Sequence, residues 1–158
     1  RKAAEEGHSG AQYNLDLCLH HGLRASFEKI NSNRLAAESG DTAAQLYLGS
    51  AFYFGKGVFQ DYEEAEQWLG KAAERGNAEA QFILGQMYKD GEGVLQNFTI
   101  AYIWFYLAAE NSTGDFNKRA ITEKEDTAEK ISGWLFPRAE EIARRWSERQ
   151  KKEIIIRN

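Results

Sequence analysis

The sequence predicts an all-α fold built from repeated helix pairs, and two observations carry that prediction. The 158 residues contain a single proline, Pro137, and no segment in which apolar and polar residues alternate as in a half-buried strand. One phrase also recurs: two alanines, a glycine, an Ala-Gln pair and an apolar run, starting at residues 2, 35 and 71. Repetition of this kind is typical of stacked two-helix units.

The spacing of the phrase matches the length of one helix pair. Its alanine pairs begin at residues 3, 36, 72 and 108, which are 33, 36 and 36 residues apart. A single unit of this size cannot bury its own apolar face, so neighbouring units must stack. We therefore expect one solenoid domain over residues 1–158, with repeats at about 1–34, 35–70 and 71–106. A C-terminal pair of capping helices follows at about 107–152.

The first helix of each unit is marked by a capping residue. Asp41 and Asn77 each follow a glycine and can accept hydrogen bonds at a helix N-terminus, which predicts first helices at 42–54 and 78–89. The leucine seven residues after each cap is expected in the core. A glycine follows that leucine, and because an interior glycine costs about 1 kcal/mol against alanine, it predicts close approach of another helix.

A Gly-x-Gly-Val turn leads to the second helix. Val58 and Val94 close these turns and are expected to pack beneath the helices. Asp61 and Asn97 are the expected N-caps, and Asp61 with Glu64 resembles a capping box. The buried stripe of the second helices is expected to contain Ala65, Trp68, Leu69, Ala72 and Ala73, matched by Ala101, Trp104, Phe105, Ala108 and Ala109.

Together these residues resemble the Sel1-like repeat, a relative of the tetratricopeptide repeat. The shared pattern is A-x-x-W-x-x-x-A-A-x-x-G-[ND]-x-x-A-Q-x-x-L-G-x-x-Y-x-x-G-x-G-V, and it covers about residues 1–110. The segments "AYIWFYLAAE" and "AEEIARRWSERQ" are similar to the closing helices of bacterial members, which extends the resemblance to about residue 150. It implies a right-handed α/α superhelix.

The first and last units depart from the pattern. The first has Asp16 in place of the glycine, is three residues shorter, and lacks both the Gly-x-Gly-Val turn and the tryptophan. We expect it to pack less regularly. In the fourth unit "ENSTGDFNKRA" replaces the glycine turn, which predicts a longer helical cap.

Composition excludes several classes of function. A net charge of −4 argues against nucleic acid as the main partner, because phosphate binding requires a basic surface. The single cysteine, Cys18, rules out an intrachain disulfide framework and a thiolate metal cluster. No run of about 18 apolar residues occurs, so no transmembrane segment is expected. Arg1 begins within a helical phrase, without methionine or a signal-like segment, which predicts a fragment. We expect this fragment to be monomeric.

The chemistry-bearing motifs favour a non-catalytic protein without cofactors. The Gly-x-Gly turns join two helices and lack the Lys-Ser/Thr of a phosphate loop. His20 and His21 are adjacent and point about 100° apart on a helix, so they do not predict a metal site. Ser50 and the other serines lie in no nucleophile elbow. The alternative of a β-lactam or cell-wall-directed hydrolase rests on the family resemblance alone.

The resemblance to tetratricopeptide repeats implies that the first helices line the concave face, where such solenoids bind peptides. With the core leucine as reference, the groove positions are two before it, and two, five and six after it. They are Tyr13, Leu17, His20 and His21 in the first unit; Leu46, Ser50, Tyr53 and Phe54 in the second; and Phe82, Gln86, Lys89 and Asp90 in the third.

We therefore predict a scaffold or adaptor that binds a protein or peptide segment in an aromatic groove. Hydrophobic contacts would supply the affinity, and the charged residues would set the orientation of the segment. A second alternative is a membrane-surface module that uses the basic last helix, where Arg144, Arg145, Arg149, Lys151 and Lys152 lie close together.

Overall fold

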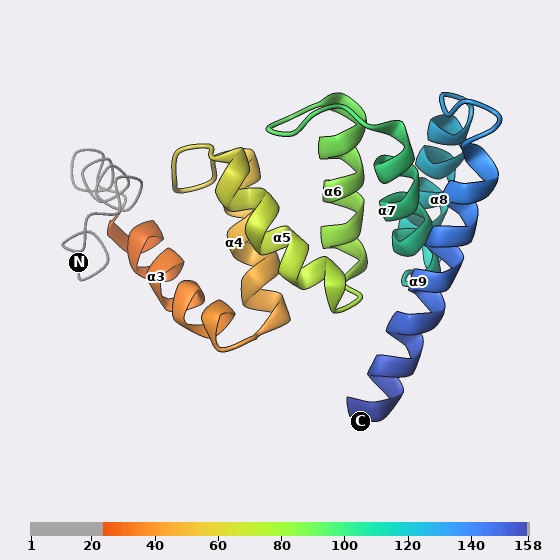
Figure 1. Ribbon diagram of the computed structural model, residues 1–158. Coiled ribbons are helices and arrows are strands. Elements are labelled where there is room, and N and C mark those ends of the chain that lie inside the picture. Colours follow the sequence, from red (N-terminus) through yellow and green to blue (C-terminus); the bar gives the residue numbers. More distant parts are fainter. Residues whose placement is uncertain (1–23, 158) are drawn as a thin grey trace. The chain divides into compact units, whose positions relative to one another are not determined.

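The computed structural model describes residues 24–157 and folds them into α-helices joined by short turns, with no strand in that range (Figure 1). This confirms the predicted all-α fold. The helices are α3 (Arg24–Glu38), α4 (Thr42–Phe54), α5 (Tyr62–Glu74), α6 (Ala78–Asp90), α7 (Phe98–Glu110), α8 (Gly114–Ala128) and α9 (Phe136–Arg157).

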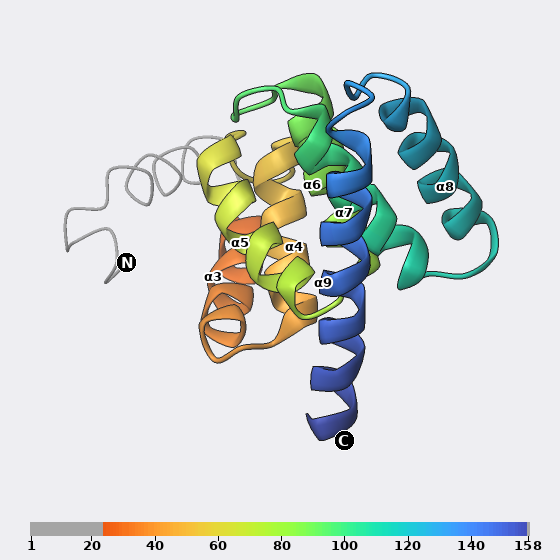
Figure 2. The same cartoon turned by 45° about the vertical axis from the view of Figure 1, so that its right-hand side comes forward.

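The chain forms two compact units, Arg1–Trp68 and Leu69–Asn158, and the boundary falls inside α5. The first unit contains α3, α4 and the first half of α5, and the second contains the rest. In the second unit α7 contacts α6, α8 and α9, and it lies between them in Figure 2. The assignment of all 158 residues to one solenoid domain stays a prediction.

The predicted caps of the first helices are confirmed. The side chain of Asp41 accepts a hydrogen bond from the backbone N–H three residues on at 2.8 Å, and that of Asn77 does the same at 2.9 Å. The preceding glycines, Gly40 and Gly76, have φ values of 96° and 86°, a conformation that residues with a Cβ rarely adopt. Sequence alone therefore places both helix starts.

The second helices begin as predicted, but one detail was wrong. Asp61 accepts hydrogen bonds from the N–H groups of Glu63 and Glu64, each at 3.1 Å. The reciprocal bond of a capping box is absent, because the N–H of Asp61 donates to the carbonyl of Phe52 at 3.0 Å. The Glu64 carboxylate instead accepts from Trp68 Nε1 at 2.9 Å, which fixes the indole of the buried stripe.

A side-chain amide repeats at one position in three consecutive units. Gln45, Gln81 and Asn117 each donate to the backbone carbonyl eight residues earlier, at 3.0, 2.9 and 2.6 Å. That carbonyl lies in the last turn of the preceding second helix and has no partner within its own helix. Since Asn117 keeps this bond, α8 is the first helix of a fourth unit, although the sequence phrase around it has changed.

The core residues of the repeats are placed largely as predicted. All members of the two second-helix stripes are buried except Ala109, which is half-buried. Val58 is buried as expected, whereas Val94 is only half-buried. A Cβ added to Gly85 would lie 2.6 Å from the ring of Phe105, so the predicted close approach is confirmed at that glycine.

Candidate partner-binding surfaces

The candidate residues of the first unit lie outside the described range. These are Tyr13, Leu17, His20 and His21. The structure places the other eight on α4 and α6, and the two helices present them very differently.

The candidates on α4 include both accessible and buried side chains. Leu46 and Ser50 are half-buried, Tyr53 is 9% exposed, and Phe54 is 53% exposed. These positions follow one another at three- and four-residue spacing, except that Tyr53 and Phe54 are adjacent. Leu46, Ser50 and Phe54 therefore share one face of α4, and Tyr53 belongs to the core beside it.

An aromatic cluster holds the exposed phenylalanine in place. The ring of Phe54 packs edge-on against Tyr53, with centroids 4.8 Å apart, and Tyr53 contacts Tyr62 at 5.7 Å. Lys56 Nζ lies 4.9 Å from the Phe54 ring centroid. The side chain of Gln60 donates to the Tyr53 carbonyl at 2.7 Å and fixes the turn that follows α4.

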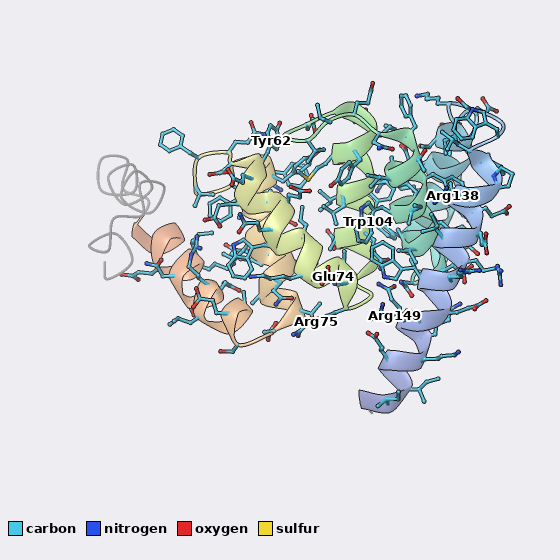
Figure 3. All side chains as sticks on the ribbon, viewed as in Figure 1. Tyr62, Glu74, Arg75, Trp104, Arg138 and Arg149 are labelled. Atoms are coloured by element: carbon cyan, nitrogen blue, oxygen red, sulfur yellow. The ribbon has the colours of Figure 1, made fainter. Side chains whose placement is uncertain are left out.

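Sequence reasoning missed Tyr62, which lies at the start of α5 (Figure 3). A signal was present, because the first residue of each described second helix after α3 is aromatic: Tyr62, Phe98 and Phe136. This position is less conspicuous in the sequence than the alanines, tryptophans and glycines of the repeat, because both Tyr and Phe occur there.

Phe82 lies in the core of the second unit. It is 5% exposed, and its ring contacts Phe105 at 5.4 Å and Phe116 at 5.3 Å. Arg119 of α8 covers the ring, with its guanidinium carbon 5.3 Å from the centroid. The predicted groove position of Phe82 is therefore occupied by α8, and the side chain cannot contact a partner in this structure.

The remaining α6 candidates are polar and lie near charges of α8. Gln86 is half-buried and Asp90 is exposed. Lys89 Nζ forms an ion pair with Glu123 of α8 at 2.8 Å, with both side chains about a quarter exposed, at 21% and 26%. Burial lowers the pKa of Lys89, but the hydrogen bond to Glu123 and the charges of Glu123, Asp90 and Asp126 outweigh it and raise the pKa.

An amide network joins four segments of the second unit. Gln81 Nε2 donates to Gln150 Oε1 of α9 at 3.1 Å, and Asn111 Nδ2 donates to Gln81 Oε1 at 3.0 Å. Gln150 Nε2 donates to the carbonyl of Ala73 at 2.9 Å. Since Gln81 and Gln150 are both buried, these bonds satisfy amides that would otherwise be costly inside a protein. This network fixes the long last helix to α5 and α6.

The basic side chains of α9 are largely neutralised by neighbours. Four of them form ion pairs: Arg144 with Glu148, Arg145 with Glu141, Arg149 with Glu153, and Lys151 with Glu110. Arg138 and Arg149 are marked on this helix in Figure 3. This pairing reduces the positive field that the membrane alternative requires of the helix.

The chemical inventory of the described residues is limited. In the range searched, no group of three or more His, Cys, Asp or Glu side chains is arranged to hold a metal ion. Among those same residues, no helix is long and apolar enough to cross a bilayer.

Comparison with known proteins identifies the family. The model of the Sel1 repeat matches residues 42–77 and 78–112, and each match begins at a first helix. A solved Sel1 repeat protein from Oxalobacter formigenes is 31% identical, with a TM-score of 0.53, and the similarity covers 77% of this chain and 93% of that one. The chain belongs to the Sel1 repeat family. Sel1 repeats typically form non-catalytic scaffolds and commonly mediate protein interactions.

A second solved member of the family covers almost the whole chain. It is described as a protective antigen present in uropathogenic Escherichia coli strains with an SLR fold, and it is 34% identical with a TM-score of 0.73. The similarity covers 99% of this chain but only 33% of that protein, so this chain spans about a third of its length. No curated protein matches the chain.

Proposed function

We propose that this Sel1 repeat chain is a non-catalytic adaptor that binds an apolar segment of a partner protein on the exposed face of α4. The face consists of Leu46, Ser50 and Phe54, with Tyr53 and Tyr62 as support. The observation that carries the proposal is the exposure of Phe54, 53%, on top of a packed aromatic pair. Aromatic side chains of this kind are typical anchors of protein interfaces.

The surroundings of Phe54 favour binding over simple exposure. Its ring is oriented by Tyr53 and Lys56 before any partner arrives, so little side-chain entropy is lost on association. Helix α4 contains no charged residue between Thr42 and Phe54. The helix itself therefore presents no charge that a partner segment with apolar side chains would have to desolvate, and Lys56, beside the Phe54 ring, is the cation such a segment would meet.

The other predicted positions remain part of the proposal where they are accessible. Gln86 and Asp90 occupy the equivalent face of α6, and Asp90 is exposed. Lys89 is already paired with Glu123, and Phe82 is covered by α8, so neither is offered as an anchor. Tyr13, Leu17, His20 and His21 stay predictions.

The test is a peptide selection followed by measured binding. Peptides selected from a random library on the purified chain are labelled, and their affinity is measured by fluorescence anisotropy. Phe54→Ala should weaken binding by about tenfold or more, the usual effect of truncating a central aromatic anchor. The unfolding midpoint should stay near that of the parent chain, because the ring is half in solvent.

Leu35→Ala is the matched control. Leu35 is 69% exposed on α3 of the same unit, so the change removes apolar surface from a different helix face. Peptide affinity should be unchanged in this variant. If Leu35→Ala and Phe54→Ala weaken binding equally, or if neither does, the α4 face is not the binding surface.

A further inference from the structure

Two loop tips of the second unit present large apolar side chains to solvent. Leu95, in the α6–α7 loop, is 92% exposed, and Trp134, in the α8–α9 loop, is 80% exposed. Neither residue belongs to the proposed peptide surface, and the core does not account for either. A single exposed apolar side chain is common on protein surfaces, but two large ones at the same edge of a unit can form an interaction site.

Both loops lie at the same edge of this unit. Lys130, two residues after the end of α8, places Nζ 5.3 Å from the ring of Phe98, the first residue of α7. Tyr102 of α7 contacts Phe136, the first residue of α9, at 5.4 Å. These contacts join the start of α7 to both ends of the α8–α9 loop, and Figures 1 and 2 show the two loops at one edge in both views.

The α8–α9 loop is locally basic. Lys130 and Arg138, both exposed, stand four residues before and four residues after Trp134, and no acidic residue occurs between them. The segment "KISGWLFPR" therefore combines an exposed indole with two flanking cations. Glu129 borders the segment, so the edge as a whole is not strongly positive, and contact would depend mainly on Trp134 and Leu95.

The size of the patch helps to identify the occupant. An aromatic side chain buries roughly 150–250 Å² when it is covered. Trp134 and the smaller Leu95 together fall well short of the ~800 Å² per partner that a stable protein interface, including one with a second copy of this chain, requires. A lipid surface has no such requirement, because acyl chains and headgroups close around individual protruding side chains. Tryptophan also favours the boundary between water and hydrocarbon.

We propose that this edge docks on the surface of a phospholipid bilayer. Trp134 and Leu95 enter the interfacial region, and Lys130 and Arg138 contact anionic headgroups. The contact is peripheral and weak for a single chain, since two inserted side chains and two cations make up the whole site. It differs from the alternative predicted from sequence, which relied on the basic residues of α9.

The test uses the purified chain and large vesicles, either of pure phosphatidylcholine or of equal parts phosphatidylcholine and phosphatidylserine. Trp134 is the only one of the four tryptophans that is mostly exposed, because Trp68 and Trp104 are buried and Trp146 is half-buried. Insertion should therefore shift the tryptophan emission to shorter wavelength and protect it from iodide. Sedimentation with the vesicles gives the partition coefficient.

The variants separate the two parts of the site. Trp134→Ala should lower the partition coefficient about tenfold and abolish the emission shift, because an apolar contact of this size is lost. Lys130→Gln and Arg138→Gln should each lower binding roughly fivefold on the anionic vesicles and little on pure phosphatidylcholine. Phe54→Ala should have no effect on lipid binding, so the adaptor proposal and this one can fail independently.

Three results would overturn the proposal. The first is no binding to either vesicle at low salt. The second is binding that Trp134→Ala leaves unchanged, which would locate the contact elsewhere. The third is an emission shift that appears with a selected protein partner and not with vesicles, which would identify the edge as a protein-binding surface.

Discussion

The first helices of the two matched repeats, α4 and α6, have the same architecture but different surfaces. Each begins at a side-chain cap and ends at a left-handed glycine, Gly55 with φ 65° and Gly91 with φ 75°. Leu46 of α4 is half-buried, and the equivalent Phe82 of α6 lies under α8. The comparison shows that a repeat position does not define a surface by itself, because the neighbouring helix decides what remains exposed.

The buried glutamines of the two helices show the same contrast. Gln81 is hydrogen-bonded to the last turn of α5, to Asn111 and to Gln150. Gln45 makes the equivalent bond to Ala37, but its Oε1 atom is buried without a partner among the described residues. The same side chain is therefore part of a connected network in one repeat and half-satisfied in the other.

The largest expected difference between the helices is at Phe82 and Leu46. Phe82→Ala should lower the free energy of unfolding by about 3–5 kcal/mol, because it leaves a cavity between three aromatic or cationic neighbours. Leu46→Ala should cost about 1–2 kcal/mol, since that side chain is only half-buried. Urea unfolding followed by circular dichroism measures both. Equal losses would mean that the two positions have the same environment.

A smaller effect is expected from the close approach at Gly85. Gly85→Ala should destabilise the chain by about 1–2 kcal/mol, because the new methyl would meet the buried Phe105 ring at 2.6–2.9 Å and the overlap outweighs the gain in helix propensity. Gly70→Ala is the matched control: its Cβ would meet nothing within 4 Å, so it should stabilise α5 by about 0.5–1 kcal/mol. Thermal unfolding of both variants checks the opposite signs, and stabilisation by Gly85→Ala would contradict the packing described.

Because Gln81 and Gln45 are bonded differently, replacing each by leucine should lower the free energy of unfolding by different amounts. Gln81→Leu should cost about 2–3 kcal/mol, because the hydrogen bonds of the buried Gln81 amide to the Ala73 carbonyl, to Gln150 and to Asn111 are lost together. Asn111 and Gln150 keep the bond to each other. Gln45→Leu should cost about 1 kcal/mol or less, since it also removes the unpartnered oxygen.

A double-mutant cycle between Gln81 and Gln150 isolates their coupling, which should be favourable by about 0.5 kcal/mol or more. Additive losses at these two positions would show that the network is only a set of independent bonds.

The smallest effect is expected from titration of the second unit at high pH. Lys89 has a raised pKa in the folded chain, and burial with the charges of Glu140 and Tyr106 raises the pKa of Tyr102 to about 12. In both cases the folded state binds the proton more tightly than the unfolded state. The contribution of these two groups to the free energy of unfolding is therefore complete below pH 10.0, the ordinary pKa of tyrosine. It is lost as the pH rises through the pKa values of the two groups in the folded chain.

Urea midpoints measured from neutral pH to about pH 12 should fall mainly above pH 10. Lys89→Met and Tyr102→Phe should each flatten this decline, whereas Phe54→Ala on α4 should leave its slope unchanged. A decline of the same steepness in all three variants would assign the alkaline sensitivity to other groups.

Local signals of the sequence were reliable where a residue acts on its own backbone. Asp41, Asn77 and Asn97 all cap helices where predicted, because a short polar side chain before an apolar run has one favourable role. The capping box at Asp61 was predicted only in part, since Glu64 is drawn to Trp68 and Arg34 instead. The sequence contained a signal for Asn117, because it lies eight residues after the second alanine of its pair, Ala109, as Gln81 lies eight residues after Ala73.

The sequence by itself determined the helix-pair repeat, the positions of the turns and the residues of the buried stripes, since these depend on spacing, caps and glycines within about forty residues. Only the tertiary structure decided which first-helix residues remain accessible. Phe82 is covered because α8 packs on it, whereas Phe54 of α4 is 53% exposed. That contact joins residues more than thirty positions apart, and no local pattern in the chain records it.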